Sequence, residues 1–184
     1  MPGYRRSHRR KIRSLPEVPL ERLQQGEGGE RTLQDWLDRS RLAYLFLDQT
    51  PVTIPAHHRA NIKRPDFLVA VDALVTVAVD AKAKAFIDGH FVLDASERRR
   101  LDGFESHFGI PVWYACFPPA EPGHCYLFRN ARLSGSAVGY EPKTATLHVP
   151  LALGFPTQHF AVPFERLSRR PIGRHDASAI SPLY

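Results

Sequence analysis

Three charged residues lie in two apolar runs, at positions that the packing of strands alone does not require. Asp66 opens the run 67–71, and Asp80 and Lys82 close the run 75–84. Side chains alternate along a strand, so Asp80, Lys82 and Lys84 share one face while the valines and alanines between them take the other. Two carboxylates and an ammonium group at the ends of adjacent strands suit a divalent metal ion and a water molecule to be activated.

Each of these residues also has a simpler explanation when it is taken alone. Asp66 could be a turn residue that begins a strand. Asp80 and Lys82 could form a surface ion pair, which contributes little to stability. The chemical interpretation therefore depends on the elements that would bring the three side chains together.

The two runs are rich in β-branched residues and are separated by a short break, which predicts adjacent strands. Upstream, Leu33, Trp36 and Leu37 have the spacing of an amphipathic helix from about residue 30 to 39, after a flexible break at residues 26–29. Residues 41–47 read as a strand that ends in a turn at 48–51. The expected order is thus helix, strand, strand, strand.

The segment after Lys84 continues the pattern with a hairpin, a helix and a further strand. Asp88-Gly89 is a tight-turn pair between apolar residues, which predicts a hairpin over 86–93. Asp94 with Glu97 resembles a capping box, and the helix that follows should end at Gly109 and Pro111. Residues 112–117 are predicted to form the next strand.

In this order of elements, Pro65-Asp66 followed by Asp80-Ala81-Lys82 resembles the signature of the PD-(D/E)xK nuclease superfamily. That superfamily includes restriction enzymes, archaeal Holliday-junction resolvases and repair nucleases. The resemblance covers roughly residues 27–117. It implies an α/β (α+β) fold: a restriction-endonuclease-like core with a mixed central sheet flanked by helices.

The resemblance also implies a site that holds Mg²⁺ or Mn²⁺. The carboxylates of Asp66 and Asp80 and the carbonyl of Ala81 would be ligands, with Glu30 in an outer or second-metal role. Glu27 competes with Glu30, which could instead be an acid in the first turn that favours the helix dipole. Lys82 would orient or help to deprotonate the attacking water, and a nearby cation would lower its pKa.

Several basic residues are candidates for contact with nucleic acid. Lys84 shares the face of Asp80, Arg64 directly precedes the motif, and Arg98 and Arg99 lie in the first turns of the helix after Asp94. The resemblance places a basic side chain of this helix near the scissile phosphate. As a run of charges, these arginines could equally be a solvated face.

The net charge of +6 is concentrated in an N-terminal arm that precedes the first acid, Glu17. Without the six basic residues of that arm, 19 basic residues face 19 acidic ones. Such an arm suits a phosphate backbone, and the alternative is a solubilising terminus. Its basic residues are Arg5, Arg6, Arg9, Arg10, Lys11 and Arg13.

We therefore expect a basic arm at 1–25, a nuclease-like core at 26–118 and a β-rich C-terminal extension at 119–184 packed on the core. Strands are predicted at 126–128, 145–149 and 160–164. Cys116 and Cys125 have neither CxxC spacing nor a zinc-finger histidine pair, so we expect reduced thiols in a cytoplasmic protein. No apolar run is long enough to span a membrane, and no secretory leader is apparent.

The combined prediction is a metal-dependent nuclease that hydrolyses phosphodiester bonds, with DNA as the expected substrate and a homodimer as an open alternative. The competing hypothesis is a non-catalytic module that uses the same fold to bind nucleic acid or protein. The sequence does not choose between repair, recombination, defence and toxin roles.

Overall fold

The structure is a computed structural model that describes residues 20–48, 50, 54–71, 75–84, 86–135 and 137–158. Its centre is a six-stranded sheet in the order β1-β2-β3-β6-β7-β10. Strands β1 (Ala43–Phe46), β2 (Phe67–Ala70) and β3 (Thr76–Lys82) form an antiparallel meander. Strand β6 (Val112–Cys116) then pairs in parallel with β3, so the sheet is mixed. The predicted fold class is confirmed.

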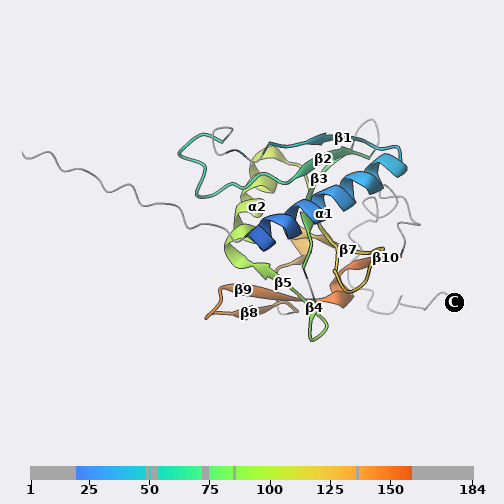
Figure 1. Ribbon diagram of the computed structural model, residues 1–184. Helices are drawn as coiled ribbons and strands as arrows, with labels where there is room; N and C mark the ends of the chain where they lie inside the picture. Colours follow the sequence, from blue (N-terminus) through green and yellow to red (C-terminus); the bar gives the residue numbers. More distant parts are fainter. Residues whose placement is uncertain are drawn as a thin grey trace, which may run out of the picture.

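The two helices cover opposite faces of this sheet (Figure 1). Helix α1 (Leu20–Arg39) packs Leu33, Trp36 and Leu37 against the valines of β3. Helix α2 (Ala95–Phe108) packs Leu101 and Phe104 on the other face, where Ala78 and its neighbours lie. The alternation along β3 therefore assigns Asp80 and Lys82 to the face that α2 covers.

Helix α1 is longer than the sequence predicted. The expected break at residues 26–29 is wrong, because the helix continues through these residues from Leu20. Gly29 is buried, and a Cβ atom there would lie 3.1 Å from the backbone nitrogen of Ala83. Its role is a close approach between α1 and the end of β3, which outweighs the cost of glycine in a helix, about 1 kcal/mol relative to alanine.

The earlier start of α1 also changes the position of Glu30 within the helix. Glu30 lies in the middle of α1 and not in its first turn. Its interpretation as an acid that favours the start of the helix dipole is therefore wrong, since that effect is confined to the first turn.

The hairpin and the second helix follow the predicted pattern. Strands β4 (Phe86–Ile87) and β5 (His90–Asp94) pair across Asp88 and Gly89, which both have positive φ, at 49° and 72°. The Asp94 side chain accepts a hydrogen bond of 2.8 Å from the backbone N–H of Glu97. Gly109 ends α2 in the left-handed conformation, with φ of 65°. These caps fix the direction in which α2 leaves β5.

The later strands complete both sheets. Strand β7 (His124–Arg129) joins β6 to β10 (Phe155–Gln158) in the central sheet. Strands β8 (Gly139–Glu141) and β9 (Thr146–Pro150) extend the β4-β5 hairpin into a four-stranded sheet, seen at the bottom of Figure 1. Two 3₁₀ turns, Asn130–Arg132 and Leu151–Leu153, connect these strands. The strand predicted at 160–164 lies outside the described residues.

Both cysteines are free and buried, on opposite faces of the sheet. Among the described residues, no helix has the length and apolar character needed to cross a membrane.

Candidate functional site

The pairing of β2 with β3 brings the two predicted aspartates together. Phe67 is opposite Val79, so Asp66 lies beside Asp80, and both are buried. The backbone N–H of Asp66 donates to the carbonyl of Val79 over 3.0 Å. The N–H of Ala81 in turn donates to Asp66 Oδ2 over 2.7 Å. The meander thus holds the Asp66 carboxylate against the end of β3.

Two lysines and a third carboxylate surround Asp80. Lys82 Nζ lies 2.5 Å from Asp80 Oδ2, and Lys63 Nζ lies 2.5 Å from Asp80 Oδ1. Both ammonium groups also contact Glu97 Oε1, at 2.9 and 2.6 Å. We call Lys63, Asp66, Asp80, Lys82 and Glu97 the carboxylate–lysine cluster.

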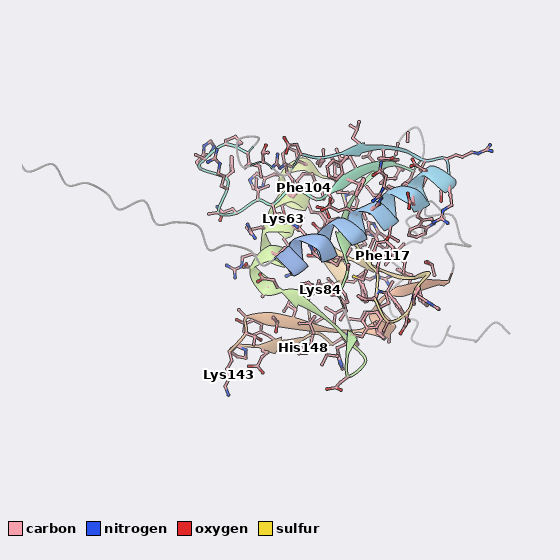
Figure 2. The ribbon with its side chains drawn as sticks, in the orientation of Figure 1. Lys63, Lys84, Phe104, Phe117, Lys143 and His148 are labelled. Carbon is pink, nitrogen blue, oxygen red and sulfur yellow. The ribbon has the colours of Figure 1, made fainter. Side chains whose placement is uncertain are left out.

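Lys63 comes from the segment that precedes β2, and this segment is fastened to α2. The N–H of Lys63 donates to the carbonyl of Arg100 over 3.0 Å, and Lys63 lies near α2 in Figure 2. A Cβ atom on Gly103 would lie 2.0 Å from the carbonyl oxygen of Asn61, so only glycine permits this approach. The backbone of α2 therefore holds the backbone segment from which the Lys63 side chain reaches the cluster.

The sequence analysis missed Lys63 and Glu97 as site residues. Glu97 was predicted only as part of a capping box, but its carboxylate reaches the two lysines. The helix cap was the one signal that could have identified it, because the first turn of α2 begins directly after β5. Lys63 lies in an irregular segment, where no periodicity gives the direction of a side chain.

Burial and mutual repulsion dominate the electrostatics of Asp66. Removal from water, followed by the nearby charge of Asp80, raises the pKa of Asp66 to about 7, although Lys63 and Lys82 oppose the shift. With all five groups ionised, the cluster has three negative and two positive charges. It therefore lacks one positive charge, which a proton on Asp66 or a bound cation can supply.

The lysines act in the opposite direction on Glu97. Burial alone would raise its pKa, but the charges of Lys82 and Lys63 lower it to about 2. For Lys82, burial would lower the pKa, but attraction to Asp80, Glu97 and Asp66 raises it well above its ordinary value. The lowering expected from the sequence depended on a bound cation; without one, the three carboxylates decide the direction of the shift.

Tyr114 lies next to the cluster on the same face. It is the β6 partner of Asp80, and its side chain is fully buried. Burial, then the charges of Asp80 and Glu97, raise its pKa well above the ordinary value, so the phenol is neutral. Its hydroxyl has no hydrogen-bond partner within the described part of the chain. An unpaired buried hydroxyl is typical of a site where a water or ligand oxygen supplies the partner.

The cluster offers a Mg²⁺-like ion two carboxylate ligands, those of Asp66 and Asp80. Over the described ranges, no group of three or more histidine, cysteine, aspartate or glutamate side chains could hold a metal ion. Mg²⁺, however, is usually bound by one or two carboxylates with water and substrate phosphate. Asp66 and Asp80 provide such a pair, and a cation would relieve the repulsion between them.

The other residues predicted to bind metal or nucleic acid are not members of the cluster. Glu30 lies on α1, which covers the opposite face of the sheet. Lys84 and Arg99 are exposed. Arg64 donates to the carbonyl of Thr50 over 2.6 Å, and Arg98 forms an ion pair of 3.0 Å with Asp102. The predicted arm residues Arg5, Arg6, Arg9 and Arg10 lie outside the described residues.

No protein-family model matches this chain, and no curated protein matches it. Among solved structures, the chain is similar to Hjc, a Holliday junction resolvase from the archaeal hyperthermophile Archaeoglobus fulgidus. The similarity covers 71% of this chain and 89% of the resolvase chain, with 19% sequence identity and a TM-score of 0.48. A similarity at this level decides nothing about activity, so a functional inference has to come from the cluster itself.

Proposed function

We propose that this protein is a metal-dependent nuclease that hydrolyses phosphodiester bonds in DNA. One observation carries the proposal: Asp66 and Asp80 are buried side by side, with Lys82 in contact with Asp80. Burial of several charges costs free energy, and the packing of the sheet does not require it. Buried charges of this kind are concentrated at functional sites. The order Pro65-Asp66 and Asp80-Ala81-Lys82, which resembles the PD-(D/E)xK signature, supports the same conclusion.

Asp66, Asp80 and the carbonyl of Ala81 would hold Mg²⁺ or Mn²⁺. When bound, such an ion neutralises charge on a phosphate and lowers the pKa of a coordinated water. The protein's own contribution is to fix the two carboxylates, since the Ala81 N–H holds one oxygen of Asp66 in place. Glu30 has a more remote role in this proposal, because its helix lies on the other face of the sheet.

Lys82 would offset charge on the phosphate in this proposal, and it would orient the attacking water or help to deprotonate it. Without metal, Asp80, Glu97 and Asp66 raise its pKa, and a cation bound to Asp66 and Asp80 would act in the opposite direction. A positioned cation stabilises the charge that develops on a phosphate in the transition state. Lys63 can act in the same way, because it makes the same two contacts.

The substrate strand would be held by basic side chains around the cluster. Lys84, Arg64, Arg98 and Arg99 are the candidates near the site, and the arm with Arg5, Arg6, Arg9 and Arg10 would add contacts to more distant phosphates. Contacts of this kind position the strand without reading its sequence.

The same cluster also gives the non-catalytic alternative one observation in its favour. Both oxygens of Asp80 already contact lysines, and an ion network of this kind can be purely structural. The two hypotheses differ in the expected response to metal. A nuclease should bind Mg²⁺ or Mn²⁺ through Asp66 and Asp80, whereas a structural network should not.

The test is to incubate the purified chain with plasmid, linear, branched and single-stranded DNA, with Mg²⁺, with Mn²⁺ and with a chelator. We expect cleavage that the chelator abolishes and that Asp80→Asn reduces by at least 100-fold. Asparagine keeps the shape of the side chain, and circular dichroism checks that the variant is folded. Wild-type cleavage by a folded Asp80→Asn protein, or no cleavage of any substrate by the wild type, would contradict the proposal.

A further inference from the structure

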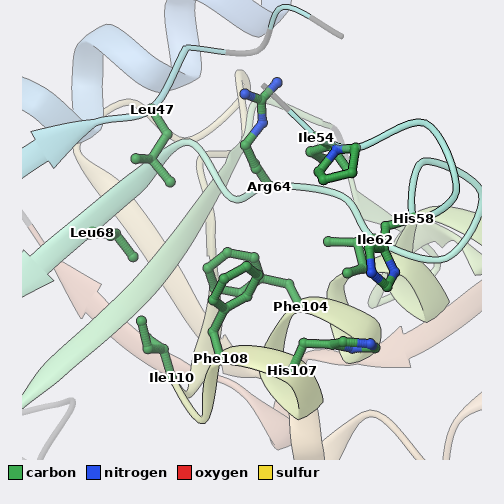
Figure 3. Close-up of a pocket in the computed structure, with 11 residues that line it drawn as sticks. Leu47, Ile54, His58, Ile62, Arg64, Leu68, Phe104, His107, Phe108 and Ile110 are labelled. Atoms are coloured by element: carbon green, nitrogen blue, oxygen red, sulfur yellow. The ribbon is translucent and has the colours of Figure 1, made fainter. Parts of the chain in front are cut away.

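An apolar pocket of ≈ 440 Å³ lies between helix α2, strand β2 and the segment that precedes β2 (Figure 3). Its volume falls within the range of about 300–1,000 Å³ that is typical of sites for small organic groups. Helix α2 contributes Phe104 and Phe108, strand β2 contributes Leu68, and the segment before β2 contributes Ile62. The pocket is therefore built from the same elements that position the cluster.

The chain itself joins the pocket to the cluster. Ile62 and Arg64 line the pocket, and Lys63 between them contacts Asp80 and Glu97. Along β2, Leu68 follows Asp66 by two residues, so both point to the same face about 7 Å apart. Neighbouring nucleotides of one extended strand can span that separation.

The aromatic rings give the pocket a surface for stacking. Phe104 and Phe108 lie with their ring centroids 4.7 Å apart at an interplanar angle of 34°. Phe104 is buried, but Phe108, which also lines the pocket, is 59% exposed. The His58 and His107 rings form a second aromatic pair, with centroids 5.3 Å apart. Exposed aromatic rings next to a phosphate site are typical platforms for unstacked bases.

The charge around the pocket favours an anionic occupant. Arg64 lines the pocket, and among the described residues no acidic side chain does. The buried Arg64 Nε has no hydrogen-bond partner in the described part of the chain. A flat apolar group attached to a phosphate complements this lining better than a neutral or basic group does.

We propose that this pocket receives the unstacked base of a nucleotide next to the phosphate held at the cluster. The proposal rests on the proposed nuclease function and adds a substrate class to it: DNA with an unpaired or easily unpaired nucleotide at the site of cleavage. A protein that acts on such DNA benefits, because an unpaired base costs little to unstack.

The experiment compares two duplexes that are identical except at a single bulged nucleotide, which carries adenine in one and is abasic in the other. Binding is measured by fluorescence anisotropy in the presence of a chelator, so that cleavage does not interfere. The wild type should bind the adenine bulge about tenfold more tightly, in line with the stacking of one base on an aromatic ring. Phe108→Ala should remove this preference and leave the affinity for the abasic duplex unchanged.

The control is Ile87→Ala, which removes a side chain of similar exposure, 55%, from the β4-β5 hairpin. It should keep the preference for adenine. Phe108→Leu keeps apolar volume without an aromatic ring and should behave like Phe108→Ala. Because Phe108 is mostly exposed, neither variant should unfold the protein.

Three outcomes would overturn the proposal, and they separate it from the nuclease function. Equal wild-type affinity for both duplexes, together with normal cleavage of plasmid DNA, would remove the pocket proposal alone. A loss of self-association in Phe108→Ala, with the base preference intact, would assign the pocket to contact between copies of the chain. Failure to bind either duplex would remove the pocket proposal, and the nuclease proposal would fall with it only if no DNA substrate is cleaved either.

Discussion

At the level of single residues, ionisation of Asp66 and ionisation of Glu97 have opposite effects on the stability of the fold. Asp66 is held at a raised pKa of about 7 by burial and by Asp80, whereas Glu97 is held at about 2 because the attraction of Lys82 and Lys63 outweighs its burial. The unfolded chain has neither environment. The pH dependence of stability should therefore report on each carboxylate separately.

For Asp66, the folded protein keeps a proton that the unfolded chain loses above its ordinary pKa of 3.8. Stability should thus fall as the pH rises from about 4 to 7 and stay low above that. Asp66→Asn keeps an acceptor for the Ala81 N–H but removes the charge. We expect it to flatten this decline and to raise the free energy of unfolding at pH 8 by on the order of 2 kcal/mol. Urea denaturation at pH 5 and pH 8, with a chelator, measures both effects.

Glu97→Gln serves as the control with the opposite sign. The folded pKa of Glu97 is below its ordinary value of 4.5, so its contribution is present above pH 4.5 and is lost as the pH falls towards 2. This variant should be less stable than the wild type at pH 8. If both variants shift stability in the same direction, the assignment of charges in the cluster is wrong.

At the level of elements, the sequence predicted those parts of the site that follow from strand periodicity. Asp66 and Asp80 lie on neighbouring strands, as predicted, because alternation along two short strands determines which side chains meet. Lys63 contacts Asp80 across 17 residues and Glu97 across 34. Contacts of that kind depend on how an irregular segment packs on a helix, which no local pattern encodes.

The glycines also show that local sequence patterns do not predict contacts between distant segments. Residues 26–29 read as a break because intrinsic propensity disfavours glycine in helices. In the structure, Gly29 lets α1 approach Ala83, and Gly103 lets the segment with Asn61 approach α2. Both are close contacts between elements distant in sequence. Propensity alone gives no indication of them, so the length of α1 was underestimated.

Gly103 provides a prediction at this scale. In Gly103→Ala, the new methyl group would lie 2.0 Å from the Asn61 carbonyl, so the segment that carries Lys63 must move. We expect a loss of about 1–3 kcal/mol in stability, which is the usual cost of overpacking. The Lys63 amide should also exchange faster with deuterium, because its hydrogen bond to Arg100 is broken.

Gly28→Ala is the matched control, since nothing lies within 4 Å of a Cβ atom at that position. It should raise stability by up to about 1 kcal/mol through helix propensity. It should leave the exchange of the Lys63 amide unchanged. An unaltered Lys63 amide in Gly103→Ala would mean that α2 does not hold this segment in place.

At the level of the whole molecule, the two faces of the central sheet differ in the kinds of side chain that they bury. The α1 face is a continuous apolar core of Leu33, Trp36, Phe67 and their neighbours. The α2 face combines an apolar core with the buried charges of the cluster and, next to them, the pocket. If the cluster is the active site, substitutions on the α1 face should affect folding more than activity, because that face carries none of the cluster residues.

The distribution of charge along the whole chain leads to the last prediction. Six basic residues precede the first acid, and the rest of the chain has equal numbers of acidic and basic residues. If the arm contacts DNA, deletion of residues 1–13 should weaken binding and flatten the dependence of log K on log salt. The slope falls by about 0.9 for each phosphate contact that is lost. Cleavage at low salt should persist, because the arm contains none of the cluster residues.

A matched variant separates charge from chain length. Replacement of the six arginines and lysines of the arm by glutamine keeps the length and should reproduce the flattened slope. A salt slope that is unchanged in both variants would identify the arm as a solubilising terminus and would leave the contacts with phosphate to residues such as Lys84 and Arg99. Because counterion release depends on charge and not on sequence, the same reduction should appear with paired and with bulged DNA. If the arm does contact DNA, it determines the affinity of the protein for DNA, while the cluster and the pocket determine cleavage and the choice of substrate.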